Sequence, residues 1–336
     1  MRPKRSERDS SRVVSRRTFT LLGAGALVGG LAGCTGDDPQ SGDGDGGTGG
    51  GDGDPDFKVF ATMPAVWDFT RQVAGDRMEA IDLVPVGEHG HDWDPQPGIV
   101  QEMDDADGFV YLREFSSWQD DAAAQLEADG DVVVIEASEG IEFFDSPAED
   151  NDEHWWMDPV ECQNGVDNIA AGLATIDPDN ADEYEANAAA FNEELGAIHE
   201  EFEAIVDRAR LNEIVVGTHD SFQWWHRRYG IDVYSPVGTS PDDAASPGDV
   251  QEIEELIEEF DIGHVLYDVG EPARLAQSLA DETGAEILPL SPVETQIDGS
   301  PDVDSDVRME PEWGYVDHFR ELNLPSLETA LDASTD

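Results

Sequence analysis

Lysine and cysteine are scarce in this sequence of 336 residues, with two of each. All basic residues together number 18, against 77 acidic ones, which gives a formal net charge of −59. Such a surface repels phosphates and excludes a nucleic-acid binder that works through a basic patch. Two cysteines are too few for a disulfide scaffold or a cysteine-based zinc finger. The 39% of hydrophobic residues and the eight tryptophans nevertheless suffice for a core, which excludes global disorder.

The few basic residues are unevenly distributed along the chain. Residues 1–33 hold seven of the 18 basic residues and only two of the 77 acidic ones, and Lys58 is the only lysine after that segment. A carboxylate surface almost free of lysine holds hydrated cations and stays soluble where salt screens charge repulsion. We interpret this composition as the adaptation of a halophile, which says where the protein works and not what it does.

The amino terminus has the features of an export signal. Paired arginines, Arg16 and Arg17, precede a short apolar, glycine-rich run at residues 21–32. The run is shorter than the roughly 20 residues of a membrane-spanning helix, and the pair is typical of twin-arginine export. The segment that ends in Cys34 resembles a lipobox, so we expect Cys34 to be lipidated and to anchor the exported protein to the outer face of the membrane. A plain amino-terminal anchor is the alternative.

The rest of the chain divides into a tether and a folded body. Residues 34–56 consist mainly of Gly and Asp, and such a segment buries too little apolar surface to offset its ordering entropy. We therefore predict the following division: signal peptide 1–33, tether 34–56, N-terminal α/β lobe 57–178, linker helix 179–210 and C-terminal α/β lobe 211–336.

Apolar runs in the body alternate with helical patterns. Short strand-like runs lie at residues 57–61, 81–84, 109–112, 132–135, 214–216, 265–267 and 287–290. This alternation favours parallel α/β sheets. Between the fourth and fifth runs, residues 181–210 contain no proline and carry apolar side chains at spacings of three and four. A helix of ~28 residues is about 42 Å long, so we predict that it connects two α/β lobes.

Four side chains with metal-binding chemistry are expected just after predicted strands. They are His91, His154, His219 and Glu294. Ligands of parallel α/β folds lie at the carboxyl ends of the strands. Three imidazoles and a carboxylate suit a tetrahedral zinc ion. Each residue alone is weak evidence, but their joint placement predicts a metal site.

The motifs around these residues resemble those of the metal-binding lipoproteins of ABC-type zinc or manganese importers, the cluster A-I or TroA-like solute-binding family, here of a haloarchaeal type. The matching residues, in chain order, are Gly87, His91, Trp93, Asp94 and Pro97; His154, Trp156, Asp158 and Pro159; Asp177, Pro178, Tyr184 and Asn187; His219, Phe222, Tyr229 and Gly230; Ser246 and Pro247; Leu288 to Pro292 with Glu294; and Tyr315, Asn323 and Leu331. The resemblance covers residues 57–331.

The resemblance implies a C-clamp fold: two α/β lobes joined by one long helix, with the metal in the cleft. His91 and His154 would come from the first lobe, and His219 and Glu294 from the second. A glutamate at the fourth place is similar to zinc-specific members, while manganese remains the alternative cargo. The implied partners are an ABC permease and its ATPase, with the receptor itself a monomer.

Two departures from the family pattern concern the zinc prediction. Gly90 and Glu153 replace the prolines that commonly precede the first two ligand histidines, and an acidic loop at residues 145–153 replaces a histidine-rich one. We interpret this loop as a solvated run, with loose metal binding as the alternative. His89 is assigned to the loop surface, with a role as alternate ligand left open.

Two other function classes compete with the importer receptor. A metallohydrolase needs three ligands, an open metal position and a nearby base, for which Glu88 or Asp92 would serve. In that case Glu294 would be free rather than a ligand, and the sequence contains no HExxH motif. A receptor for haem or a siderophore would keep the fold, but three converging histidines argue against it.

Overall fold

The computed structural model describes residues 55, 57–91, 93–147, 149–241, 244–301, 303 and 305–333. The predicted signal peptide, Cys34 and all of the tether except Pro55 lie outside these residues. The described residues belong to one compact unit, Gly53–Asp336. Among them, no helix combines the length and the apolar composition that crossing a bilayer requires.

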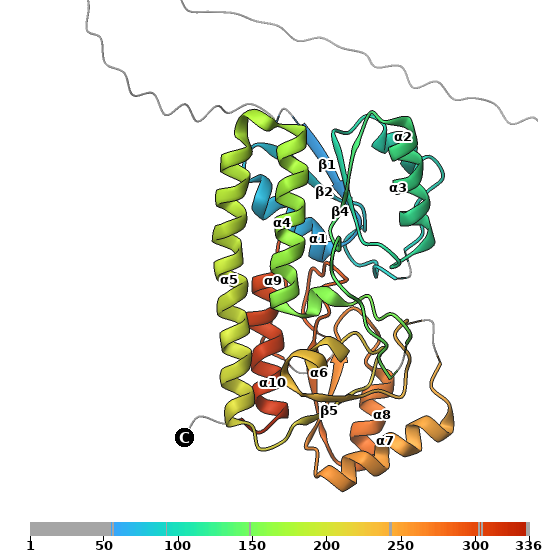
Figure 1. Cartoon of the computed structure of the whole chain (residues 1–336). Helices are drawn as coiled ribbons and strands as arrows, with labels where there is room; N and C mark the ends of the chain where they lie inside the picture. The colour runs from blue at the N-terminus through green and yellow to red at the C-terminus, as the bar shows by residue number, and fades with distance from the viewer. Residues whose placement is uncertain are drawn as a thin grey trace, which may run out of the picture. The chain divides into compact units, whose positions relative to one another are not determined.

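Two four-stranded sheets organise this unit (Figure 1). The first contains β1 (Phe57–Ala61), β2 (Met78–Asp82), β3 (Gly108–Tyr111) and β4 (Val133–Glu136) in the order β2-β1-β3-β4. The second contains β5 (Glu213–Val216), β6 (Asp232–Tyr234), β7 (His264–Asp268) and β8 (Glu286–Leu290) in the order β6-β5-β7-β8. Every pair of neighbouring strands is parallel. The predicted fold class, two α/β lobes with parallel sheets, is confirmed.

Helices follow the strands in both halves. The first half contains α1 (Pro64–Ala74), α2 (Ile99–Met103), α3 (Ser117–Asp129) and α4 (Pro159–Ile176), with 3₁₀ turns at Trp155–Met157 and Pro178–Asn180. The second contains α6 (Gln223–Tyr229), α7 (Pro247–Phe260) and α8 (Arg274–Thr283). The chain closes with α9 (Tyr315–Asp317), a π-helical turn at His318–Asn323 and α10 (Leu324–Ala330). Parallel strands require such crossover connections.

One helix runs alongside both halves. Helix α5 (Ala181–Arg208) has 28 residues and is therefore about 42 Å long. Its buried side chains recur every three or four residues: Tyr184, Ala188, Phe191, Leu195, Ile198, Phe202 and Ile205. This face contacts α1 and α4 of the first half and α6 and α10 of the second, and α4 and α10 lie beside it in Figure 1. The apolar core therefore continues along α5 from one sheet to the other.

Two elements were not predicted from the sequence, the strand β6 and the long helix α4. Asp158 caps α4, with its side chain accepting a hydrogen bond from the Val160 amide, and Pro159 occupies the first helical position. Two glycines weaken the helical pattern, but both allow close packing. A Cβ atom at Gly165 would lie 2.4 Å from Cη2 of Trp155, and one at Gly172 would lie 2.4 Å from Cδ1 of Ile135. These glycines thus let α4 lie directly against β4 and the turn that carries Trp155.

Candidate metal centre

The four predicted ligand residues come together from four separate segments. His91 lies in the loop after β2, His154 just before the 3₁₀ turn at Trp155, His219 just after β5 and Glu294 just after β8. One nitrogen or oxygen atom of each side chain lies within 4.8 Å of the corresponding atoms of the other three. His91, His219 and Glu294 follow strands whose carboxyl ends face this region of the parallel sheets. The prediction that His154 also follows a strand was wrong, because β4 ends at Glu136 and a loop lies between them.

The distances between these atoms match the edges of a metal tetrahedron. Nε2 of His91 lies 3.2 Å from Nε2 of His154 and 3.6 Å from Oε2 of Glu294. His154 Nε2 lies 3.6 Å from Oε1 of the same carboxylate, and His219 Nε2 lies 3.6 Å from its Oε2. In a tetrahedron with metal–ligand bonds of about 2.0–2.1 Å, ligand atoms are about 3.3 Å apart. The four distances, 3.2–3.6 Å, are therefore close to the spacing of zinc ligands.

The carboxylate of Glu294 lies among the imidazoles of the site. Its side chain is fully buried, and neither oxygen has a hydrogen-bond partner among the residues that the structure describes. Burial alone would raise the pKa of Glu294, but the surrounding imidazoles outweigh burial and hold it well below its ordinary value. A buried carboxylate without hydrogen bonds is costly, and a cation placed among these imidazoles would remove that cost.

Two further carboxylates orient the ligand imidazoles. Asp152 Oδ1 lies 3.0 Å from Nδ1 of His154, and Glu271 Oε1 lies 2.5 Å from Nδ1 of His219. A neutral imidazole that donates from Nδ1 to a carboxylate presents the lone pair of Nε2 to a metal. Neither residue was predicted from the sequence. Asp152 precedes His154 by two positions and offered a local signal, whereas Glu271 reaches His219 across 52 residues and offered none.

The same carboxylates change the protonation of the metal-free site. Burial disfavours the charged form of His154, but the hydrogen bond to Asp152 and the nearby acidic groups outweigh burial and raise its pKa to about 9. The pKa of His219 is also raised, because Glu271 and Glu294 outweigh its burial. Burial dominates at His91 and lowers its pKa to about 3. In the site without metal, these shifts favour the protonated forms of His154 and His219 and the neutral form of His91.

Aromatic side chains exclude water around the centre. Trp155, Trp156, Trp224 and Trp225 are all fully buried. The ring of Trp156 lies 5.1 Å from that of His154, and its indole nitrogen donates to the Pro292 carbonyl at 2.8 Å. Trp224 donates to the carbonyl of Asp152 at 3.2 Å. Both tryptophans thus fix segments that carry ligands or their orienting groups, in addition to packing in the core.

Two surface assignments from the sequence need correction. His89 is not on the loop surface: only 7% of it is exposed, and its Nε2 lies 3.1 Å from Oδ2 of Asp268. The acidic loop is solvated only in part, because Asp152 and Glu153 at its end are buried. Burial is the largest influence on Glu153 and raises its pKa to about 7. Both deviations arise because the loops pack against the metal centre.

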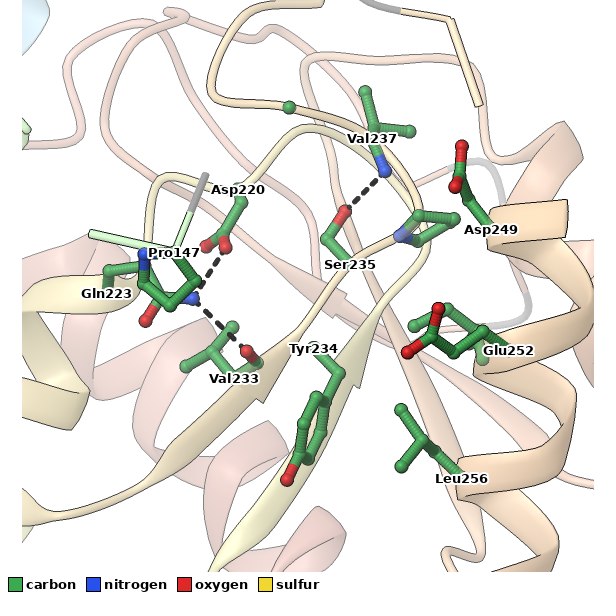
Figure 2. A pocket seen from close by; sticks show the side chains of 13 residues that line it. Pro147, Asp220, Gln223, Val233, Tyr234, Ser235, Val237, Asp249, Glu252 and Leu256 are labelled. Carbon is green, nitrogen blue, oxygen red and sulfur yellow. Dashed lines mark hydrogen bonds between the residues drawn. The ribbon is translucent and has the colours of Figure 1, made fainter. Parts of the chain in front are cut away.

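A second hollow lies apart from these ligands, between β6 and α7 (Figure 2). It has a volume of about 320 Å³, and its lining includes Asp220, Gln223, Ser235 and Asp249. Asp220 accepts hydrogen bonds from the Gln223 side chain and the Phe222 amide. Asp249 accepts one from the Ser246 amide as part of a helix cap. These two carboxylates are satisfied by the protein itself.

Comparison with known proteins agrees with this geometry. A family model described as the periplasmic component A of the zinc-uptake complex (ZnuA) matches residues 59–321. The high-affinity zinc uptake system protein ZnuA of Bacillus subtilis is 26% identical over 287 residues, which are 81% of this chain and 87% of that protein. The zinc-binding lipoprotein AdcA of Streptococcus pneumoniae is 27% identical over 251 residues, and this match covers 70% of the chain but only 50% of AdcA.

Solved structures show the same fold. The laminin-binding protein Lmb of Streptococcus agalactiae, described as an adhesin with metal-transporting activity, superposes with a TM-score of 0.69 at 26% identity. The match covers 82% of this chain and 99% of Lmb. The family match spans most of the chain and nearly the whole described body, so it extends far beyond the ligand motifs. This protein therefore belongs to the ZnuA family of zinc-uptake solute-binding proteins, which are receptors rather than enzymes.

Proposed function

We propose that this protein captures Zn²⁺ outside the cell, with His91, His154, His219 and Glu294 as its four ligands, and delivers the ion to an ABC permease driven by its ATPase. The observation that carries the proposal is that three imidazole nitrogens lie 3.6 Å from the buried carboxylate of Glu294, which has no hydrogen-bond partner among the described residues. Four protein ligands leave no open position for a catalytic water, which suits reversible capture rather than hydrolysis.

The donor set favours zinc over manganese. Three imidazole nitrogens and one carboxylate suit zinc, whereas manganese prefers sites richer in oxygen. The carboxylates of Asp152 and Glu271 contact the Nδ1 atoms of His154 and His219, so they support imidazole ligation instead of adding oxygen ligands. We therefore infer that zinc is the preferred cargo of this site.

We also propose how the receptor is exported and held. A twin-arginine signal at residues 1–33 would export the folded protein, and lipidation of Cys34 would tether a monomeric receptor to the outer face of the membrane through residues 34–56. The excess of acidic over basic residues suits a salt-rich exterior. The division of the body into lobes 57–178 and 211–336, joined by helix 179–210, is part of this proposal.

Metal titration of the purified protein in concentrated KCl tests the proposed function. We expect one tightly held zinc ion per chain, measured by elemental analysis and by competition with a chelator. His219→Ala should lose this zinc. The matched variant His199→Ala, which changes a histidine of α5 outside the ligand set, should keep it. Preferential retention of manganese would overturn the cargo, and the absence of bound metal would overturn the proposed function.

A further inference from the structure

A second cluster of metal-binding side chains adjoins the four ligands. His89, His219 and Asp268 are all buried, and one donor atom of each lies within 4.8 Å of the corresponding atoms of the others. His89 Nε2 lies 3.1 Å from Oδ2 of Asp268, which in turn lies 3.9 Å from Nδ1 of His219. Two imidazoles and a carboxylate at these separations form a donor set suited to zinc.

The local structure holds these donors in place. Asp268 ends β7, and its Oδ1 accepts a hydrogen bond from the Gly270 amide at 2.8 Å, so Oδ2 is directed to His89. Gly270 also permits the close approach of the histidine. A Cβ atom at this position would lie 2.5 Å from Oγ1 of Thr295 and 3.2 Å from Cδ2 of His89. The cluster is therefore built into the packing between the loop after β2 and the loop after β7.

The two clusters share side chains. His219 Nε2 lies 3.6 Å from Oε2 of Glu294 in the four-ligand site, and its Nδ1, which contacts Glu271, lies 3.9 Å from Oδ2 of Asp268. His89 Nε2 lies 3.5 Å from Oε2 of Glu294, close to the spacing within the first site. An ion that moves from one cluster to the other would thus remain within reach of His219 and Glu294 throughout.

We propose that His89, Asp268 and His219 form a second position for the zinc ion, which the ion occupies in turn with the four-ligand position during entry and release. This inference rests on the proposed function and adds a route by which the zinc ion enters and leaves the site. Once Glu271 leaves Nδ1 of His219, the second position has three protein ligands and leaves a place for water, as an open zinc site does. The four-ligand position would hold the ion, and the second position would hold it with one ligand fewer on the way in and out.

The shared imidazole explains why the two positions are filled in turn. A neutral imidazole carries one proton and offers one lone pair. When Nε2 of His219 binds the ion, the proton stays on Nδ1, where Glu271 accepts it. When Nδ1 binds the ion, the proton is on Nε2, which contacts the hydroxyl oxygen of Ser221. Each tautomer of His219 therefore has a hydrogen-bond acceptor. When the ion changes position, the ring gives the proton of one nitrogen to water and takes one from water on the other nitrogen, so its charge does not change.

A double-variant comparison in the full chain tests the second position. His91→Ala removes a ligand of the first position only, and this variant should still bind one zinc ion with reduced affinity. Adding His89→Gln or Asp268→Asn should weaken zinc binding at least a further ~10-fold, on the scale of losing a group that supports a metal. Adding His264→Gln, at the opposite end of β7, should change nothing. Zinc affinity is measured by competition with a chelator.

The outcomes separate the alternatives. Equal affinity of His91→Ala with and without His89→Gln would overturn the second position. A loss with His89→Gln but none with Asp268→Asn would make His89 a spare ligand of the first position, and would also overturn the proposal. Failure of the unaltered chain to bind zinc would instead overturn the proposed function.

A kinetic measurement covers the case in which His91→Ala does not fold. In an otherwise unaltered chain, His89→Gln should slow the release of zinc to excess chelator several-fold while its Kd changes less, because binding and release slow together. His264→Gln serves as the control. Unchanged release rates in His89→Gln would contradict a second position on the path.

Discussion

The metal centre and the hollow between β6 and α7 both present buried carboxylates, and they differ in what those carboxylates contact. In the hollow, Asp220 is paired with Gln223 and a backbone amide. In the metal centre, Glu294 has four imidazoles around it and no hydrogen bond to the residues that the structure describes. Acidity alone therefore does not identify a cation site in a chain with 77 acidic residues. Imidazoles around an unsatisfied carboxylate are the informative feature.

Removing a ligand imidazole should produce the largest difference between the two regions. We expect His154→Ala to weaken zinc binding more than ~100-fold, because even the groups that only orient a ligand are worth 10–100-fold. A chelator competition assay measures the loss. If His154→Ala bound zinc as tightly as the unaltered chain, His154 would not be a ligand.

The pH dependence of zinc affinity should be the next largest effect. Zinc binds neutral imidazole, so it must displace the protons carried by His154, whose pKa is raised to about 9, and by His219, whose pKa is also raised. Affinity should therefore rise with pH up to about 9 and fall on acidification. Two displaced protons correspond to about 100-fold per pH unit and one to about 10-fold.

Calorimetry in buffers of different ionisation enthalpy measures this proton release directly. The expected result at pH 7 is a release of between one and two protons for each zinc ion bound. Zinc affinity that stayed constant from pH 7.5 to 5.5 would contradict histidine ligation.

Asp152→Asn should have a smaller effect that also changes the pH profile. The variant loses the carboxylate that orients His154, and we expect zinc affinity to fall about 10–100-fold. Because that carboxylate also raises the pKa of His154, affinity should depend less steeply on pH in the variant. A lower affinity with an unchanged pH profile would indicate a purely structural role for Asp152.

The smallest effect is expected in the hollow. Asp249 lines the hollow, is exposed, and accepts a hydrogen bond from the Ser246 amide at the start of α7. Asp249→Asn should therefore leave zinc affinity within about twofold of the unaltered chain, since substitutions without shared partners act independently. A large loss of zinc binding in this variant would show that the two regions are coupled.

The parts of this protein that follow periodic patterns were predictable from sequence. The parallel sheets and the helix α5 are confirmed, because alternation and a regular apolar stripe are local signals. Helix α4 was not predicted because Gly165 and Gly172 weaken its helical pattern. These glycines are needed for close contacts with Trp155 and Ile135, and such contacts cannot be seen in the sequence. The meeting of the four ligand residues was predicted from strand ends, and their ligand role stays a prediction. Glu271 and the burial of His89 depend on tertiary contacts.

X-ray absorption at the zinc edge of the loaded protein tests the central claim most directly, because it reports the atoms bound to the ion. We expect four nitrogen or oxygen ligands at about 2.0–2.1 Å, with the scattering signature of three imidazole rings, and one ring fewer in His91→Ala, which still binds zinc. A first shell made only of oxygen, or one that does not change in His91→Ala, would contradict zinc ligation by these histidines.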